Sequence, residues 1–189
     1  MRASRKDELI DKALEAFYRD GFHATGMDKL VAETGISKTS MYKYFRTKED
    51  LILATLERRH ERLTALLVDG PAARADTPKG QLVASFDALQ EWIAGDDFNS
   101  CMFIKASSEY QDPSHPIHQA AAAHKRSLTD HLASLARRAG AKEPETLARQ
   151  LMLLKEGAIV TAHIQGKAFA APDAKDAART LINLACPKD

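Results

Sequence analysis

The twelve residues from Ser37 to Lys48 gather side chains that suit binding to a polyanion. They contain Lys38, Lys43, Arg46 and Lys48 and no acidic residue, and hydroxyl side chains lie between these cations. Ammonium and guanidinium groups bind phosphates, and short hydroxyl side chains hydrogen bond to phosphates or to base edges. The segment therefore has the chemistry of a nucleic-acid-binding surface, although four charges alone are also common on a solvated helix face.

The charge is divided unevenly along the 189 residues, whose formal net charge is +1. The first 48 residues carry ten Lys and Arg against seven Asp and Glu, whereas the remainder carries seventeen against nineteen. A basic excess of this kind attracts a polyanion over a longer range than single contacts do. The charge pattern thus indicates the N-terminal quarter of the chain as the nucleic-acid-binding part.

Hydrophobic periodicity predicts the helices that position this segment. Apolar residues at three- and four-residue steps predict an amphipathic helix over residues 5–20, which Gly21 ends. A second helix of barely two turns is predicted to start at Thr25, three residues before Asp28 in the spacing of a capping box, and to stop at Gly35.

A third short helix is predicted from Ser37, a good N-cap, to about Arg46. Two short helices joined by a Gly-Ile-Ser turn are typical of a helix-turn-helix, whose second helix lies in the DNA major groove. A short αα-hairpin in any helical protein uses the same turn and cap, so the turn by itself leaves both interpretations open.

The stretches "TGMDKL" from Thr25 and "TGISKTSMYKYFRTKEDL" from Thr34 together resemble the DNA-binding domain of the tetracycline-repressor (TetR) family. Val31 and Tyr44 depart from the family pattern, which usually has Ala and often His at these positions. The resemblance implies a homodimeric DNA-binding regulator. By default such a regulator is a repressor that binds a palindromic double-stranded operator and leaves it when a small organic ligand binds. The resemblance also implies an all-α fold of about nine helices, with a three-helix DNA-binding domain over residues 1–47 and a ligand-binding and dimerisation domain over residues 48–189.

Carried over to this sequence, the resemblance and the helix positions give a set of candidate DNA-binding residues. Basic residues of the N-terminal arm, Arg2, Arg5 and Lys6, are further candidates. The principal candidates are Thr25, Ser37, Lys38, Thr39, Ser40, Tyr42, Tyr44 and Lys48.

The rest of the chain is predicted to be helical, with no strand pattern. Thr47 and Asp50 cap a long helix that runs to about Val68, and a Gly-, Pro- and Ala-rich loop follows over residues 69–80. Thr77 and Pro78 mark the next helix start within that stretch. The further helices are predicted at residues 78–95, 100–110, 116–139, 144–166 and 173–186.

The last two predicted helices carry small residues at four-residue spacing, among them Gly157 with Thr161 and Ala158 with Ala162. Such stripes allow close helix approach, so these helices are expected to form a homodimer, although packing within one chain uses the same pattern. Apolar helices with a few polar groups suit a ligand pocket. The candidate ligand-binding residues are Phe86, Trp92, Cys101, Phe103, His124, Met152, Glu156 and His163.

Other classes of protein fit the sequence less well. No segment has the apolar length of a membrane span or a signal peptide, which leads us to expect a cytoplasmic protein without a membrane partner. No catalytic, metal-binding or cofactor-binding motif is recognisable, so neither an enzyme nor a cofactor is expected. Two alternatives stay open: a metal-responsive regulator using Glu109, Asp112, His115 and His118, and a thiol-responsive one using Cys101.

Overall fold

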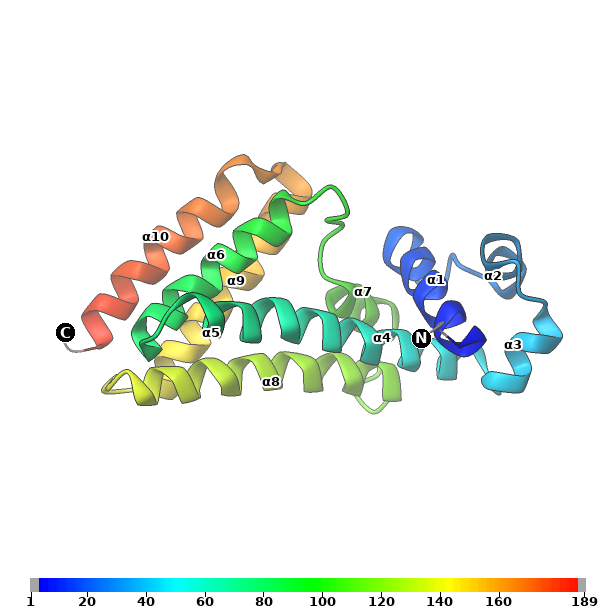
Figure 1. The fold of residues 1–189 in the computed structure, drawn as a ribbon, viewed down its shortest axis with the longest axis horizontal. Helices are drawn as coiled ribbons and strands as arrows, with labels where there is room; N and C mark the ends of the chain where they lie inside the picture. The colour runs from blue at the N-terminus through cyan, green and yellow to red at the C-terminus, as the bar shows by residue number, and fades with distance from the viewer. Residues whose placement is uncertain (1–3, 187–189) are drawn as a thin grey trace. The chain divides into compact units, whose positions relative to one another are not determined.

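A computed structural model describes residues 4–186, and every regular element in this range is a helix (Figure 1). The all-α prediction is confirmed. The described chain forms two compact units: the first holds residues 4–62 together with Cys101–His124, and the second holds Leu63–Ser100 together with residues 125–186. The functional boundary predicted between residues 47 and 48 is a different division and stays a prediction.

The first unit begins with α1 (Arg5–Asp20), α2 (Met27–Thr34) and α3 (Lys38–Tyr44). The apolar stripe of α1 is buried, and the hydroxyl of Ser4 caps its N-terminus by accepting from the Asp7 N–H at 3.1 Å. Gly35 ends α2 in the left-handed conformation, with φ 69°, which lets the chain turn sharply into α3. The predicted helix-turn-helix is therefore formed.

The helix α4 (Lys48–Thr64) starts with the reciprocal cap that the sequence predicts. The Thr47 N–H donates to Asp50 Oδ2 at 3.0 Å, and the Asp50 N–H donates to Thr47 Oγ1 at 3.0 Å. Arg58 ties α4 to α1 through Asp7 at 2.8 Å and Asp11 at 2.7 Å. The first unit is completed by α7 (Met102–Glu109) and the start of α8 (Pro116–Arg138).

The prediction of a loop over residues 69–80 is wrong for residues 69–74, which are helical. A π-helix, η1 (Ala65–Asp69), follows α4 directly, and α5 (Gly70–Arg74) continues it. Pro71 lies in the first turn of α5, where its missing N–H costs least, and the wider π turn before it accommodates the proline ring. Composition alone suggested a break because it cannot show this local change of helix register.

The second unit is built around α6 (Pro78–Ala94), α9 (Pro144–Gln165) and α10 (Lys167–Ala185). Within it, α10 packs against both α9 and α6 (Figure 1). Thr77 caps α6 as predicted, accepting from the Gly80 N–H at 3.1 Å. Apolar side chains from these helices form the core, among them Phe86, Leu89, Leu151, Ile159, Ala178 and Ile182.

The last helix, α10, begins at Lys167 and not near Asp173, as the sequence suggested. Alanines at positions 168, 170 and 171 favour helix, and Pro172, at the sixth position, removes one intrahelical hydrogen bond without ending the helix. Within residues 4–186, none of the helices combines the length and the apolar character that crossing a bilayer requires.

Candidate nucleic-acid interface

The helix α3 is fixed at its N-terminus by the cap that the sequence predicts. Ser37 has the extended backbone of an N-cap, and its Oγ accepts from the Ser40 N–H at 3.3 Å. The same hydroxyl donates to Ser40 Oγ at 3.0 Å. Met41, 1% exposed, anchors the helix from below, and Phe45 is buried just beyond its end. These contacts set which face of α3 meets the solvent.

That outer face carries most of the predicted DNA-binding side chains. Lys38 and Thr39 are exposed in the first turn, and Ser40 is half-buried behind them. Tyr42 is 49% exposed and Tyr44 is 40% exposed, values that are high for large aromatic side chains. Because Tyr42 follows Lys38 by four residues, both lie on one face of the helix. The face therefore offers ammonium and hydroxyl donors together.

Lys38 is paired with an acidic residue of the preceding helix. Its Nζ lies 2.7 Å from Asp28 Oδ1, and the hydrogen bond to this carboxylate raises the pKa of Lys38. The lysine is consequently a fixed cation at neutral pH, held across the turn between α2 and α3. A phosphate or base that binds it must compete with Asp28, whose side chain is 92% exposed.

Lys48, the first residue of α4, is half-buried. Burial lowers the pKa of its ammonium, and the nearby charges of Glu109 and Glu49 oppose this shift. Its amine is thus less freely hydrated than that of Lys38. The structure places both lysines in the same unit as α3.

The predicted cap by Thr25 is wrong. The N-cap of α2 is Gly26, which makes no side-chain cap, and Thr25 is 0% exposed. Its Oγ1 is buried and has no hydrogen-bond partner among residues 4–186. Because the helix starts one residue later than predicted, the threonine turns inward and does not belong to the exposed face.

Of the N-terminal arm residues, Arg2 lies outside the described residues. Arg5 is exposed, and Lys6 Nζ lies 5.4 Å from the centroid of the Phe45 ring. Lys6 is therefore packed against the residue that follows α3.

A carboxylate that the sequence offered only as a metal ligand holds the turn between α1 and α2. Glu109, the last residue of α7, accepts from the backbone N–H groups of Phe22 at 2.9 Å and His23 at 2.6 Å. It also lies 2.9 Å from His23 Nδ1. A Cβ on Gly21, whose φ is 86°, would lie 2.9 Å from Glu109 Oε1, so only glycine allows this approach.

Lys105 makes a second contact between α7 and the end of α1. Its Nζ donates to the Tyr18 carbonyl oxygen at 2.8 Å, and burial lowers the pKa of its ammonium. No sequence signal could have revealed either contact, since the partners are more than 80 residues apart.

The metal-ligand candidates do not assemble. Asp112 instead accepts from the Ser114 N–H at 2.8 Å, and His118 Nδ1 lies 2.8 Å from the Tyr110 carbonyl oxygen. Over the part of the chain that the structure describes, no group of three or more His, Cys, Asp or Glu is arranged to hold a metal ion.

Three of the predicted ligand-binding residues lie in the first unit: Cys101, Phe103 and His124. The rings of Phe103 and His124 stack with centroids 3.7 Å apart. His124 Nδ1 lies 2.9 Å from Nδ1 of His60, a residue that the sequence analysis missed. Cys101 is buried at the N-cap of α7 and forms no disulfide.

The other five lie in the second unit: Phe86, Trp92, Met152, Glu156 and His163. Glu156 has the partner that its place in an apolar helix required, since its Oε1 lies 2.6 Å from Lys125 Nζ. His163, in contrast, is exposed, because that side of α9 faces solvent. The neighbour that sequence reasoning missed is Lys155, which is 6% exposed and lies 4.5 Å from the Phe86 ring centroid.

Comparison with known proteins decides the family. Residues 9–55 match the model of "Bacterial regulatory proteins, tetR family". A solved putative TetR transcriptional regulator of Streptomyces avermitilis is 30% identical, covers 97% of this chain and 98% of its own, and superposes with a TM-score of 0.82. The chain belongs to the TetR family.

Further similarities agree with the TetR assignment. SCO4454, a TetR-family regulator from Streptomyces coelicolor, is 25% identical, covers 96% of this chain and 95% of its own, and has a TM-score of 0.91. The transcriptional repressor NemR of Escherichia coli is 28% identical over 120 residues, which are 61% of this chain and 58% of NemR. As a TetR-family member, the protein is a DNA-binding transcriptional regulator and not an enzyme.

Proposed function

We propose that the protein is a homodimeric repressor whose two α3 helices read a palindromic operator, and that a small organic effector releases it. The observation that carries the proposal is the outer face of α3, where Lys38, Thr39, Tyr42 and Tyr44 stand exposed above the buried Met41. Short donors in the first turn suit base edges, and the tyrosines and Lys48 suit phosphates. One such helix reads few base pairs, so two are needed for a specific site.

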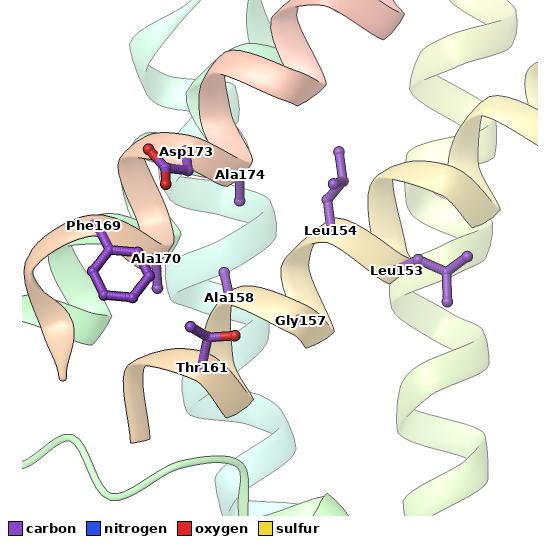
Figure 2. A pocket seen from close by; sticks show the side chains of 9 residues that line it. All are labelled: Leu153, Leu154, Gly157, Ala158, Thr161, Phe169, Ala170, Asp173 and Ala174. Carbon is purple, nitrogen blue, oxygen red and sulfur yellow. The ribbon is translucent and has the colours of Figure 1, made fainter. Parts of the chain in front are cut away.

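An exposed apolar face on α9 and α10 supports a homodimer through these helices. Leu153 is 72% exposed, Ile164 is 73% exposed and Leu184 is 79% exposed. A shallow groove of about 340 Å³ lies between the two helices, with Phe169 at its edge and Gly157 and Ala158 among its lining residues (Figure 2). Exposed leucines and an isoleucine on these two helices favour burial against a second copy of the chain.

The small residues of these helices divide between two roles. Ala162 and Ala178 are buried inside the unit, where they let α9 and α10 pack closely. Gly157 and Thr161 line the open groove (Figure 2). Both interpretations of the stripe that the sequence left open are thus supported, each by different residues.

An effector can act only by binding one conformation better than another. The candidate ligand-binding residues lie in both units, and α4 and α8 each contribute residues to both. Ligand binding that shifts either helix would alter the spacing of the two α3 helices in a dimer, and a coupling of 1–3 kcal/mol is typical.

A thiol-responsive regulator is the second candidate, because Cys101 lies at the start of α7 outside any disulfide, and the far end of α7 holds the α1–α2 turn through Glu109. The similarity to NemR also bears on it, since a structure of that protein is described as its reduced form. If peroxide released the DNA from wild type and not from Cys101→Ser, this candidate would be favoured over a non-covalent effector.

The test of operator binding is fluorescence anisotropy with DNA from immediately upstream of the protein's own gene, against scrambled DNA and across salt. We expect tight, salt-sensitive, sequence-selective binding that Tyr42→Ala loses. Glu143→Gln, an exposed change outside both α3 and the groove between α9 and α10, is the matched control. Equal and weak binding of both DNAs by wild type and Tyr42→Ala would contradict the proposal.

The dimer is tested by light scattering with Ile164→Glu, which places a charge on the apolar face of α9. Wild type is expected to have twice the mass of one chain, and the variant the mass of a single chain. Lys142→Glu, an exposed substitution elsewhere in the second unit, should stay dimeric. A monomeric wild type would contradict the homodimer, and an unchanged dimer in Ile164→Glu would exclude this face of α9 from the interface.

A further inference from the structure

The interior of the second unit contains a lysine that forms no ion pair with any residue between 4 and 186. Lys155, on α9, is 6% exposed, and its Nζ donates to the Ser85 carbonyl oxygen of α6 at 2.6 Å. The same Nζ lies 4.5 Å from the centroid of the Phe86 ring. A carbonyl dipole and an aromatic face both attract a cation, but neither carries a negative charge.

The nearest carboxylate in sequence is already used. Glu156 points its Oε1 at Lys125 Nζ, 2.6 Å away, and this pair is only half-buried. Among residues 4–186, no carboxylate lies within ion-pair distance of Lys155 Nζ, although fifteen other ion pairs are formed. An ammonium has three N–H donors, and a buried charge is stable only when it is paired. Within the described part of the chain, Lys155 therefore has no carboxylate paired with its Nζ.

Two titratable groups, His131 and Glu156, act on Lys155 without forming an ion pair with it. His131 of α8 interacts electrostatically with it, and burial first and then the charges of Lys155 and Arg138 lower the pKa of that imidazole. Burial likewise lowers the pKa of Lys155 to about 7, with Glu156 opposing the shift. An anion placed here would pair with Lys155 in its protonated form, and the low local dielectric would strengthen the attraction between the two charges.

We propose that Lys155 anchors an anionic effector, a small organic carboxylate whose apolar part packs against Phe86. The inference rests on the proposed release of the protein by an effector, and it specifies the chemical class of that effector. A carboxylate suits the position because it accepts two hydrogen bonds from an ammonium and supplies the missing charge. The aromatic face of Phe86 beside Nζ gives the adjoining carbon skeleton an apolar surface.

The way Lys155 is packed connects binding to conformation. In this structure Nζ is closed in by α6, through Ser85 and Phe86, and is almost inaccessible to solvent. A carboxylate that reaches Nζ must displace or share the Ser85 hydrogen bond, so it prefers an arrangement in which α6 and α9 have separated. Such a preference for one arrangement over another is what an effector needs.

The test compares carboxylates with neutral molecules of the same skeleton. Benzoate, hexanoate and decanoate are each compared with the corresponding primary amide. For every compound, the melting temperature of the full-length protein in its presence and its dissociation constant are measured. The variants are Lys155→Met, which keeps length without charge, and Lys142→Met, an exposed lysine of the same unit, as the matched control. Lys155→Gln, which keeps a neutral donor, replaces the methionine variant if that one does not fold.

We expect at least one carboxylate to stabilise wild type and Lys142→Met more than its amide does. Its dissociation constant should rise at least about tenfold in Lys155→Met, the effect of losing a charge-assisted hydrogen bond. Equal stabilisation of wild type and Lys155→Met would overturn the proposal. The same conclusion follows if no carboxylate of the panel exceeds its amide on wild type.

Operator anisotropy in the presence of the same carboxylates separates this inference from the proposed function. Release of DNA by a carboxylate in wild type and not in Lys155→Met supports both. A carboxylate that binds through Lys155 and leaves the operator bound confirms the anion site and overturns its role as effector site. A wild type that binds no DNA specifically overturns the proposed function, while the melting temperatures still decide whether the anion site exists.

Discussion

Lys38 in the first unit and Lys155 in the second have opposite environments, and their pKa values are shifted in opposite directions. Lys38 lies on the surface of the first unit beside the carboxylate of Asp28, which raises its pKa. Lys155 lies in the interior of the second unit against a carbonyl and an aromatic ring, and burial lowers its pKa to about 7. The first is a permanent cation suited to a polyanion, whereas the charge of the second depends on pH and on what binds beside it.

The largest expected effect is on stability, and it comes from Lys155→Met. The unfolded chain holds this proton up to a pKa near 10.5 and the folded chain only to about 7, so the cost of burying the charge is fully present below pH 7 and is relieved as pH rises towards 10.5. We expect the free energy of unfolding of Lys155→Met to exceed that of wild type by about 1–4 kcal/mol at pH 6. By pH 10 this difference should be lost.

Chemical denaturation of wild type and Lys155→Met between pH 6 and pH 10 measures this difference. Glu156 and His131 are the titratable groups that interact with Lys155 or are perturbed by it, and both remain in the variant. Lys38→Met is the matched control and should leave the pH dependence of stability unchanged. A pH dependence that survives in Lys155→Met would mean that another group causes it.

The second effect is on DNA affinity, which the substitution of Lys38 should lower and the substitution of Lys155 should not. Lys38→Met removes a cation in the first turn of α3, so operator affinity should fall about tenfold, with a shallower dependence on salt. Lys155→Met should bind operator DNA as wild type does when no effector is present. Anisotropy titrations across salt measure both, and equal losses in the two variants would show that the comparison fails.

A smaller effect is expected where α7 holds the first unit together. Glu109→Gln keeps the shape of the side chain but weakens the hydrogen bonds from the Phe22 and His23 N–H groups, which we expect to cost about 1–2 kcal/mol of stability. Glu143→Gln, an exposed change in the second unit, serves as the control. Melting by circular dichroism measures both, and an unchanged Glu109→Gln would show that the carboxylate does not support the turn.

The smallest effect is expected at Asp28, which competes with DNA for Lys38. Asp28→Asn frees the lysine and removes a negative charge from the surface, so binding to scrambled DNA should tighten about two- to threefold. Selectivity for the operator should fall because the lysine is no longer held in one place. If scrambled DNA bound more weakly in this variant, Asp28 would have to aid binding rather than oppose it.

The helix pattern, the helix-turn-helix and the caps at Ser37, Thr47 and Thr77 follow from local sequence, because each depends on residues within a few positions of one another. The same local rules failed at Pro71 and Pro172, where neighbouring residues kept the chain helical in spite of a proline. They also failed at Thr25, where a shift of one residue in the helix start moved the side chain from surface to interior.

The sequence by itself determined the all-α class and which residues α3 presents outward, since a short helix with one buried methionine leaves little choice of face. Tertiary structure alone decided which charges are paired. Asp28 meets Lys38 across a turn, Glu109 reaches a turn more than 80 residues away, and Lys155 is buried opposite Ser85, 70 residues distant, with no carboxylate at hand. Burial and pairing across such separations depend on how the helices pack, and these two properties fix the charge state and the role of each lysine.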